Sequence, residues 1–278
     1  CCTTQEFVVT EAWRQMTDIG LLFIDGYHTA EQVRFDYEAF ADKLAPRAGF
    51  AYDVTGDGRW KVYGSWGVFY DVMKLELPID IDTVKGFLAP VEGAALHQAA
   101  RECSRFGPCL EIGSYCGKST IYLAAGCKTA GGVLFAVDHH RGSEEHQLGE
   151  EYHDPALYDD SARLMDSFRE FRANIRRAGL EDTVVPVVAP TSVAARQWQT
   201  PLSLVFIDGG HSMEAAVTDY RSWSGHLKAG GVLAIHDLFP DPATGGQAPY
   251  TIYQLALASG LYEEMARVET LGLLRRIY

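Results

Sequence analysis

The chain has 278 residues, of which 47% are hydrophobic and 22% are charged, a composition typical of a soluble globular protein. Its formal net charge of -13 argues against a nucleic-acid partner, because most of the surface would repel a phosphate backbone. The sequence contains no apolar run near the roughly 20 residues of a membrane span, and most of its cysteines have the pattern of buried thiols in a reducing compartment. We therefore expect a cytoplasmic protein.

The sequence contains an internal repeat, with one copy near its start. Residues 21–37, LLFIDGYHTAEQVRFDY, match residues 204–220, LVFIDGGHSMEAAVTDY, at a constant offset of 183. A complete α/β series precedes the second copy, whereas only 20 residues precede the first. We therefore predict a partial half-domain at residues 1–72, which repeats the region around 195–245 and lacks a glycine loop, followed by a complete domain at 73–278.

Helices and short apolar strands alternate from residue 91 onward. Continuous Val, Ile and Leu runs are typical of parallel strands buried on both faces, so the pattern predicts a doubly wound, Rossmann-like α/β sheet. The expected helices cover 91–106, 118–126, 162–178, 213–227 and 250–260. The expected strands cover 108–115, 131–138, 183–189, 202–209, 230–237 and 271–278.

The loop after the first of these strands, LEIGSYCGKST at 110–120, resembles a phosphate loop but fails its spacing. A P-loop has four residues between its glycines, and only three separate Gly113 from Gly117. The dinucleotide fingerprint also fails, because Tyr115 stands where its second glycine would be. Glu111, just ahead of the loop, would repel a polyphosphate and favours a cationic ligand.

The pattern that remains joins this loop to a second acid, Asp138, at the end of the next strand. Asp138 is placed to accept hydrogen bonds from ribose hydroxyls, and the helix after Gly117 offers backbone N–H groups to a single carboxylate. A cofactor with a ribose, a carboxylate, an ammonium and a sulfonium meets these conditions, as S-adenosylmethionine does. A strand-to-helix turn with purely structural glycines is the alternative.

These residues, with Asp208 and the pair His236-Asp237, resemble the class I S-adenosylmethionine-dependent methyltransferases over about residues 80–278. LEIGSYCGKS is similar to the catechol O-methyltransferase branch, and FIDGGHS with GGVLAIHD is similar to bacterial small-molecule methyltransferases. The resemblance implies a cofactor site that comprises Glu111, Gly113, Ser114, Tyr115, Gly117, Ser119, Asp138, His139, Pro190 and Thr191. Within it Asp138 would bind ribose, His139 and Pro190 would lie near the adenine, and Thr191 would either join them or cap a helix.

The resemblance also implies a metal site and a base. Positions matching Asp208, His236 and Asp237 hold magnesium in the catechol-type family, but His236 replaces a carboxylate there, and imidazole suits manganese, iron or zinc better. Alternatively, the two acids order loops and His236 is a base or a core residue. His211 stands where that family has a proton-accepting lysine, and histidine can do the same work beside Asp208. The alternative role for His211 is to cap the helix near Ser212.

We therefore expect methyl transfer from S-adenosylmethionine to a hydroxyl oxygen of a small molecule. The alternative is a non-catalytic methyltransferase-like protein, whose half-domain pairs with the complete domain or with a second copy as a homodimer. The acidic, histidine-rich segment at 139–164 is expected to form a lid over the cofactor.

Overall fold

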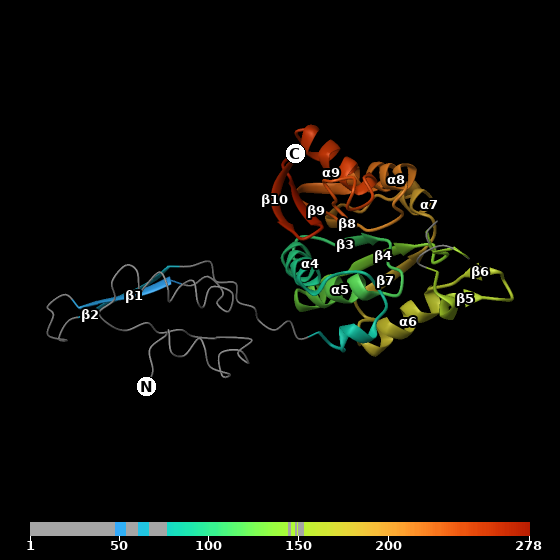
Figure 1. Cartoon of the computed structure of the whole chain (residues 1–278), viewed down its shortest axis with the longest axis horizontal. Helices are drawn as coiled ribbons and strands as arrows, with labels where there is room; N and C mark the ends of the chain where they lie inside the picture. Colours follow the sequence, from blue (N-terminus) through green and yellow to red (C-terminus); the bar gives the residue numbers. More distant parts are fainter. Residues whose placement is uncertain (1–47, 54–60, 67–76, 144–145, 148, 150–152) are drawn as a thin grey trace. The chain divides into compact units, whose positions relative to one another are not determined.

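Figure 1 shows the computed structural model of the chain, which describes residues 48–53, 61–66, 77–143, 146–147, 149 and 153–278. The chain divides into two units, Cys1–Lys74 and Leu75–Tyr278. In the first unit, β1 (Ala48–Asp53) pairs antiparallel with β2 (Lys61–Trp66). The first copy of the sequence repeat, at residues 21–37, lies outside the described residues, so the half-domain stays a prediction.

Seven strands form the sheet of the second unit, in the order β10-β11-β9-β8-β3-β4-β7. From β9 to β7 the neighbouring strands are parallel, whereas β11 is antiparallel to both β9 and β10. The strands are β3 (Cys109–Ile112), β4 (Leu134–Asp138), β7 (Val184–Val188), β8 (Leu202–Ile207), β9 (Leu227–Ile235), β10 (Tyr262–Val268) and β11 (Leu271–Arg276). The α/β sheet of mostly parallel strands predicted from the sequence is therefore confirmed.

Helices cover both faces of this sheet (Figure 1). One face carries α4 (Pro90–Cys103), α5 (Lys118–Thr129) and α6 (Phe168–Arg177), and the other carries α7 (Thr191–Ala194), α8 (Met213–Trp223) and α9 (Ala248–Ala258). Side chains alternate along β8, so that Leu204 and Phe206 join the first core and Val205 and Ile207 join the second. Burial on both faces explains the continuous apolar runs of the strands.

Short elements complete the second unit. The 3-10 helices are η1 (Ile81–Thr83), η3 (Pro155–Leu157), η4 (Ala195–Gln197) and η5 (Ser224–His226), and β5 (Tyr158–Asp159) pairs with β6 (Leu164–Met165). The prediction of one helix over 162–178 is wrong at its start, because the second strand of this hairpin occupies the first residues. Arg163 has a left-handed φ of 53°, and Asp166 accepts a hydrogen bond from the N–H of Phe168 as the helix begins.

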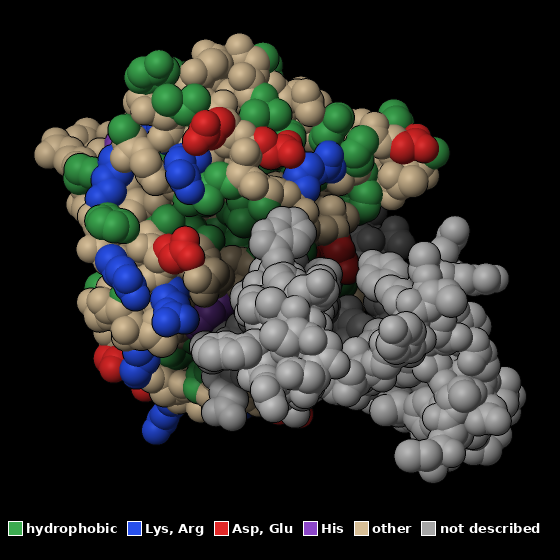
Figure 2. Space-filling model, turned by 90° about the vertical axis from the view of Figure 1, so that its left-hand side faces the viewer, with side chains coloured by type: hydrophobic (Ala, Val, Ile, Leu, Met, Phe, Trp, Pro, Cys, Tyr) green, Lys and Arg blue, Asp and Glu red, His purple; other side chains and the backbone are tan. Residues whose placement is uncertain are grey.

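The surface agrees with the composition. None of the helices in the described ranges combines the length and the hydropathy needed to cross a membrane. Cys103, Cys109, Cys116 and Cys127 are buried free thiols. On the face drawn in Figure 2, outside its grey part, acidic and basic side chains are interspersed among apolar ones. The negative net charge therefore does not gather into one acidic patch there.

Candidate functional site

The predicted site residues follow the carboxyl ends of adjacent parallel strands. β3 leads into Gly113, β4 ends at Asp138, β8 leads into Asp208 and β9 leads into His236. The chain winds from β3 to one side through β4 and β7, and then returns to the other side through β8 and β9. The loop after β3 therefore lies where the winding direction reverses, which is the usual ligand position in open α/β sheets.

This loop needs its two glycines for different reasons. Gly113 has a φ of 86°, and a Cβ there would lie 1.9 Å from the carbonyl oxygen of Asp208, so the loop packs directly against the end of β8. Gly117 has a φ of 93° and is the N-cap of α5. Tyr115, between them, is also left-handed with a φ of 43°. Such backbone strain clusters at functional sites.

Asp138 organises the loop from the next strand. Its Oδ2 accepts hydrogen bonds from the N–H groups of Ser114 and Tyr115, both at 2.9 Å, and its Oδ1 accepts one from the N–H of His140 at 2.7 Å. A carboxylate accepts about four hydrogen bonds, so these three leave capacity for one more donor, such as a ribose hydroxyl.

Glu111 lies in β3, just ahead of the loop. The residue is fully buried, and the hydroxyl of Thr120 donates to its Oε2 at 2.5 Å. The hydroxyl groups of Ser114 and Ser119 also interact with this carboxylate. Burial raises the pKa of Glu111 to about 7, and nearby hydroxyl groups offset only part of this rise. Glu111 is thus buried with a raised pKa, and its predicted place in the cofactor site stays a prediction.

The predicted adenine residues surround the end of β4. His139 is exposed, and its Nδ1 accepts a hydrogen bond from the N–H of Arg141 at 3.0 Å. Pro190 is the N-cap of α7, and Ala189 before it donates to the carbonyl of Asp138 at 3.2 Å. This hydrogen bond extends the β4–β7 ladder by one residue, and the contact of Pro190 with adenine stays a prediction. Ser119 is buried in the first turn of α5.

Thr191 has a role that the sequence did not suggest. Its hydroxyl accepts a hydrogen bond from the indole N–H of Trp223 at 2.7 Å and bonds to Asp219. Since α7 has no side-chain cap, the alternative of Thr191 as a helix cap is wrong. Asp219 is buried, and burial raises its pKa to about 6. Asp219 could have been singled out in the sequence, because both copies of the repeat end in an Asp-Tyr pair, Asp36-Tyr37 and Asp219-Tyr220.

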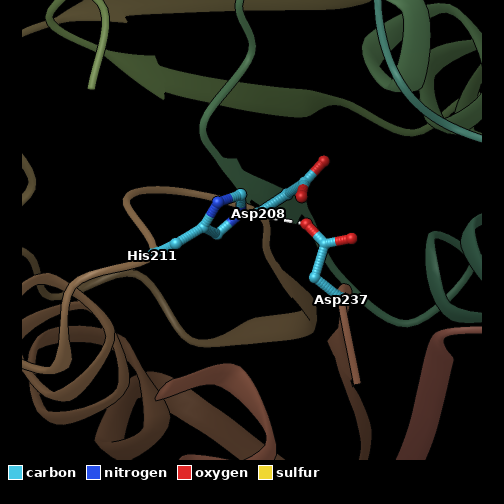
Figure 3. A group of neighbouring side chains, drawn as sticks. All are labelled: Asp208, His211 and Asp237. Carbon is cyan, nitrogen blue, oxygen red and sulfur yellow. Dashed lines mark ion pairs between the residues drawn. The ribbon is translucent and has the colours of Figure 1, made fainter. Parts of the chain in front are cut away.

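Asp208, His211 and Asp237 converge at the ends of β8 and β9 (Figure 3). One ligand atom from each lies within 4.8 Å of the others, and His211 Nε2 is 2.9 Å from Asp237 Oδ2. Burial alone would raise the pKa of Asp237, but hydrogen bonds from His211 and His236 hold it well below its usual range. Ser212 caps α8 with its own side chain, so the alternative of His211 as that cap is wrong.

His236 lies behind this group. Its Nδ1 is 3.0 Å from Asp208 Oδ1, and its Nε2 is 3.0 Å from Glu92 Oε2. Burial alone would lower the pKa of His236, but the charge of Asp208 and hydrogen bonds to the surrounding carboxylates raise it well above its usual range. Both ring nitrogens are thus engaged by carboxylates. The group that could hold a metal ion comprises Asp208, His211 and Asp237, whereas the predicted ligand His236 lies outside it, and the metal site itself stays a prediction.

A cavity of about 410 Å³ opens beside the glycine loop. Its lining residues are Lys85, Gly86, Phe87, Tyr115, His153, Asp154 and Pro155. The rings of Phe87 and Tyr115 lie 6.2 Å apart, and the His146 ring lies 5.2 Å from that of Tyr115. The cavity therefore places aromatic side chains next to the loop.

Comparisons with known proteins agree with this geometry. Residues 110–238 match the family model described as a methyltransferase domain. The cofactor-bound Rv0187 from MTB is 20% identical, with 70% of this chain and 84% of that chain covered and a TM-score of 0.50. The Bacillus cereus O-methyltransferase in complex with SAH is 18% identical, with 74% and 95% covered and a TM-score of 0.50. The O-methyltransferase NovP is 17% identical, with 66% and 79% covered and a TM-score of 0.50.

The fold and its strand-end site thus define a class I methyltransferase architecture. Residues 110–238 match a methyltransferase domain, and the second unit shares its fold with solved O-methyltransferases, which supports the resemblance to class I S-adenosylmethionine-dependent methyltransferases seen in the sequence.

Proposed function

We propose that this protein transfers the methyl group of S-adenosylmethionine to a hydroxyl oxygen of a small molecule. One observation carries the proposal: the glycine loop contacts both of the acids, Asp138 and Asp208, to which we assign roles in the reaction. Its backbone donates to Asp138 on one side, and Gly113 packs against the backbone of Asp208 on the other. A cofactor that lies over this loop would be within reach of both acids.

The residues around the loop fit such a cofactor. When bound, S-adenosylmethionine supplies a methyl group on a positively charged sulfur. Asp138 can accept one further hydrogen bond from ribose, and the adjoining cavity of about 410 Å³ offers room beside Tyr115. The adenine contacts of His139, Pro190 and Thr191 stay predictions.

His211 is the residue that we propose as the general base. Asp237 accepts a hydrogen bond from its Nε2, which orients the imidazole and selects the tautomer in which Nδ1 accepts a proton. Asp208 lies beside the pair and would share in orienting the acceptor hydroxyl. The main contribution of the chain would be alignment of the acceptor oxygen with the methyl carbon and the sulfur.

A divalent metal gives His211 a second role. Two carboxylates and an imidazole suit manganese, iron or zinc better than magnesium, so Asp208, His211 and Asp237 fit such an ion. A bound ion would lower the pKa of the acceptor hydroxyl. In that case His211 is a ligand and not the base, so the two roles are alternatives.

The test uses methyl-labelled S-adenosylmethionine with a panel of phenols, catechols and aliphatic alcohols, and detects labelled products by mass spectrometry. We expect His211→Asn to lower kcat by about 10²–10⁴. His226→Asn is the matched control, because His226 packs on Trp223 outside the site. Activity lost to a chelator and restored by Mn²⁺ in the wild type, with weaker Mn²⁺ binding in His211→Asn, would identify His211 as a ligand.

Two results would contradict the proposal. Labelled product that carries the methyl group on nitrogen would overturn the acceptor atom. Calorimetric binding of S-adenosylmethionine without turnover of any acceptor would instead favour the non-catalytic methyltransferase-like protein. We also keep the proposals that residues 1–72 form a half-domain and that the chain pairs with a second copy. Sedimentation of the full chain and of residues 73–278 measures whether the first segment causes dimerisation.

A further inference from the structure

We infer that Glu92 is a positioning residue of the methyl-transfer site, which acts through His236 on the carboxylate of Asp208. Glu92 lies in the first turn of α4, within a segment for which the sequence predicts a helix and no functional role. Its kinetic role rests on the proposed function, whereas its contact with His236 stands independently.

The Glu92 carboxylate is fixed in orientation. Its Oε1 accepts hydrogen bonds from the N–H and the hydroxyl of Thr270, at 2.8 and 2.7 Å. Its Oε2 accepts from the N–H of Ala89 at 3.2 Å and faces His236 Nε2 at 3.0 Å. A carboxylate accepts about four hydrogen bonds, so every acceptor position is used. Rotation of this buried group would break several hydrogen bonds at once.

The fixed carboxylate in turn fixes the His236 ring. Its Nε2 is held by Glu92, and its Nδ1 lies 3.0 Å from Asp208 Oδ1 and 3.5 Å from Asp237 Oδ2. The Phe206 ring packs on the imidazole with a centroid distance of 6.4 Å. A ring held from both sides cannot flip without losing two charge-assisted hydrogen bonds. Asp208 therefore meets a donor in one defined position.

Exposure rises along this chain of contacts. The side chains of Glu92 and His236 are 3% and 4% exposed, whereas those of Asp208, Asp237 and His211 are 21%, 25% and 35% exposed. The network thus leads from the core to the surface where an acceptor would bind. Outer partners of this kind orient the groups that meet the substrate, and their loss costs about 10- to 100-fold in activity in well-studied sites.

A purely structural role for Glu92 is the competing explanation. An acid in the first turn stabilises a helix through its dipole, and the contacts with Ala89 and Thr270 serve that purpose. The contact with His236 is not needed for it. The experiment must therefore separate an effect that passes through His236 from a loss of stability.

The first arm compares Glu92→Gln with Glu102→Gln in the full chain. Glu102 lies on the same helix, is exposed and bonds only to Gln98 among the contacts seen in the described residues, so it is a matched control. We expect Glu92→Gln to lower kcat about tenfold or more, while the Kd for S-adenosylhomocysteine changes less than about twofold. Glu102→Gln should change neither quantity.

The second arm is a double-mutant cycle with His236→Asn. If Glu92 acts through His236, the double variant has the kcat of His236→Asn alone, because the interaction is already lost. Multiplicative losses would overturn the inference, as would a kcat of Glu92→Gln within twofold of the wild type. Thr270→Val provides a second variant if Glu92→Gln does not fold, and should lower kcat by about fivefold or less through one lost hydrogen bond.

The third arm does not depend on turnover. In ¹⁵N-histidine NMR spectra, the ring signals of His236, assigned by their loss in His236→Asn, should shift in Glu92→Gln and not in Glu102→Gln. Unchanged signals would overturn the inference with the proposed function intact. A wild-type chain that methylates nothing would overturn the proposed function and, with it, the kinetic role of Glu92.

Discussion

The two halves of the strand-end edge are held together by different groups. At the ends of β3 and β4, Asp138 accepts hydrogen bonds from the backbone of the glycine loop. At the ends of β8 and β9, side chains bind one another, and Glu92 joins them from 144 residues away in the sequence. The cofactor half should therefore be sensitive to backbone geometry and local charge. The catalytic half should be sensitive to the identity of each side chain.

The largest effect is expected for Gly113→Ala. The new Cβ would lie 1.9 Å from the Asp208 carbonyl oxygen, and backbone cannot move aside cheaply. We expect the free energy of unfolding to fall by more than about 3 kcal/mol, with loss of S-adenosylmethionine binding by calorimetry. Gly131→Ala is the control, because Gly131 is also left-handed but a Cβ there meets no atom within 4 Å. It should cost only about 1 kcal/mol. Equal losses of unfolding free energy in Gly113→Ala and Gly131→Ala would contradict the proposed sensitivity of the glycine loop to backbone geometry.

The second effect concerns the pH dependence of folding. The pKa of Glu111 is about 7 in the folded chain, above its ordinary value of 4.5, so the folded state holds this proton more tightly than the unfolded state. The binding of this proton adds about 3 kcal/mol to the free energy of unfolding. This contribution is complete below pH 4.5 and is lost as the pH rises through 7.

Glu111→Gln, which is always neutral, should remove the contribution of Glu111 to the pH dependence, whereas buried Asp219, with a pKa raised to about 6, still contributes near pH 5. Denaturant unfolding at pH 5 and pH 8 measures it, and Glu102→Gln should keep the wild-type slope. A slope as large in Glu111→Gln as in the wild type would show that other groups cause it, and that Glu111 does not bind the proton.

The smallest effect is expected for Asp138→Asn. The amide keeps the size of the side chain but loses the charge that attracts two loop N–H groups, so we expect a loss of about 1–2 kcal/mol in unfolding free energy. The affinity for S-adenosylmethionine should fall about tenfold, as expected for one weakened hydrogen bond to ribose. Asp182→Asn, at an exposed partner of Lys128, should leave both quantities nearly unchanged. Unaltered affinity in Asp138→Asn would remove Asp138 from the cofactor site.

The same contrast explains what the sequence could predict. The parallel sheet followed from continuous apolar runs, and the loop followed from the spacing of Gly113 and Gly117, because both depend on local pattern. The pairing of His236 with Glu92 depends on where α4 packs, so no local sequence pattern predicts it. For the same reason, the sequence did not show that His211, and not His236, lies in the candidate metal group. Strand β10 was missed because most of its side chains are exposed or half-buried at the edge of the sheet.

The turn between β10 and β11 has a practical consequence. Thr270, in that turn, donates twice to Glu92, and its carbonyl accepts a hydrogen bond from the N–H of Leu238. A tag, fusion or truncation that disturbs the hairpin of β10 and β11 would therefore also disturb the hydrogen bonds that join Thr270 through Glu92 to His236. Preparations intended for assays should carry their affinity handles elsewhere.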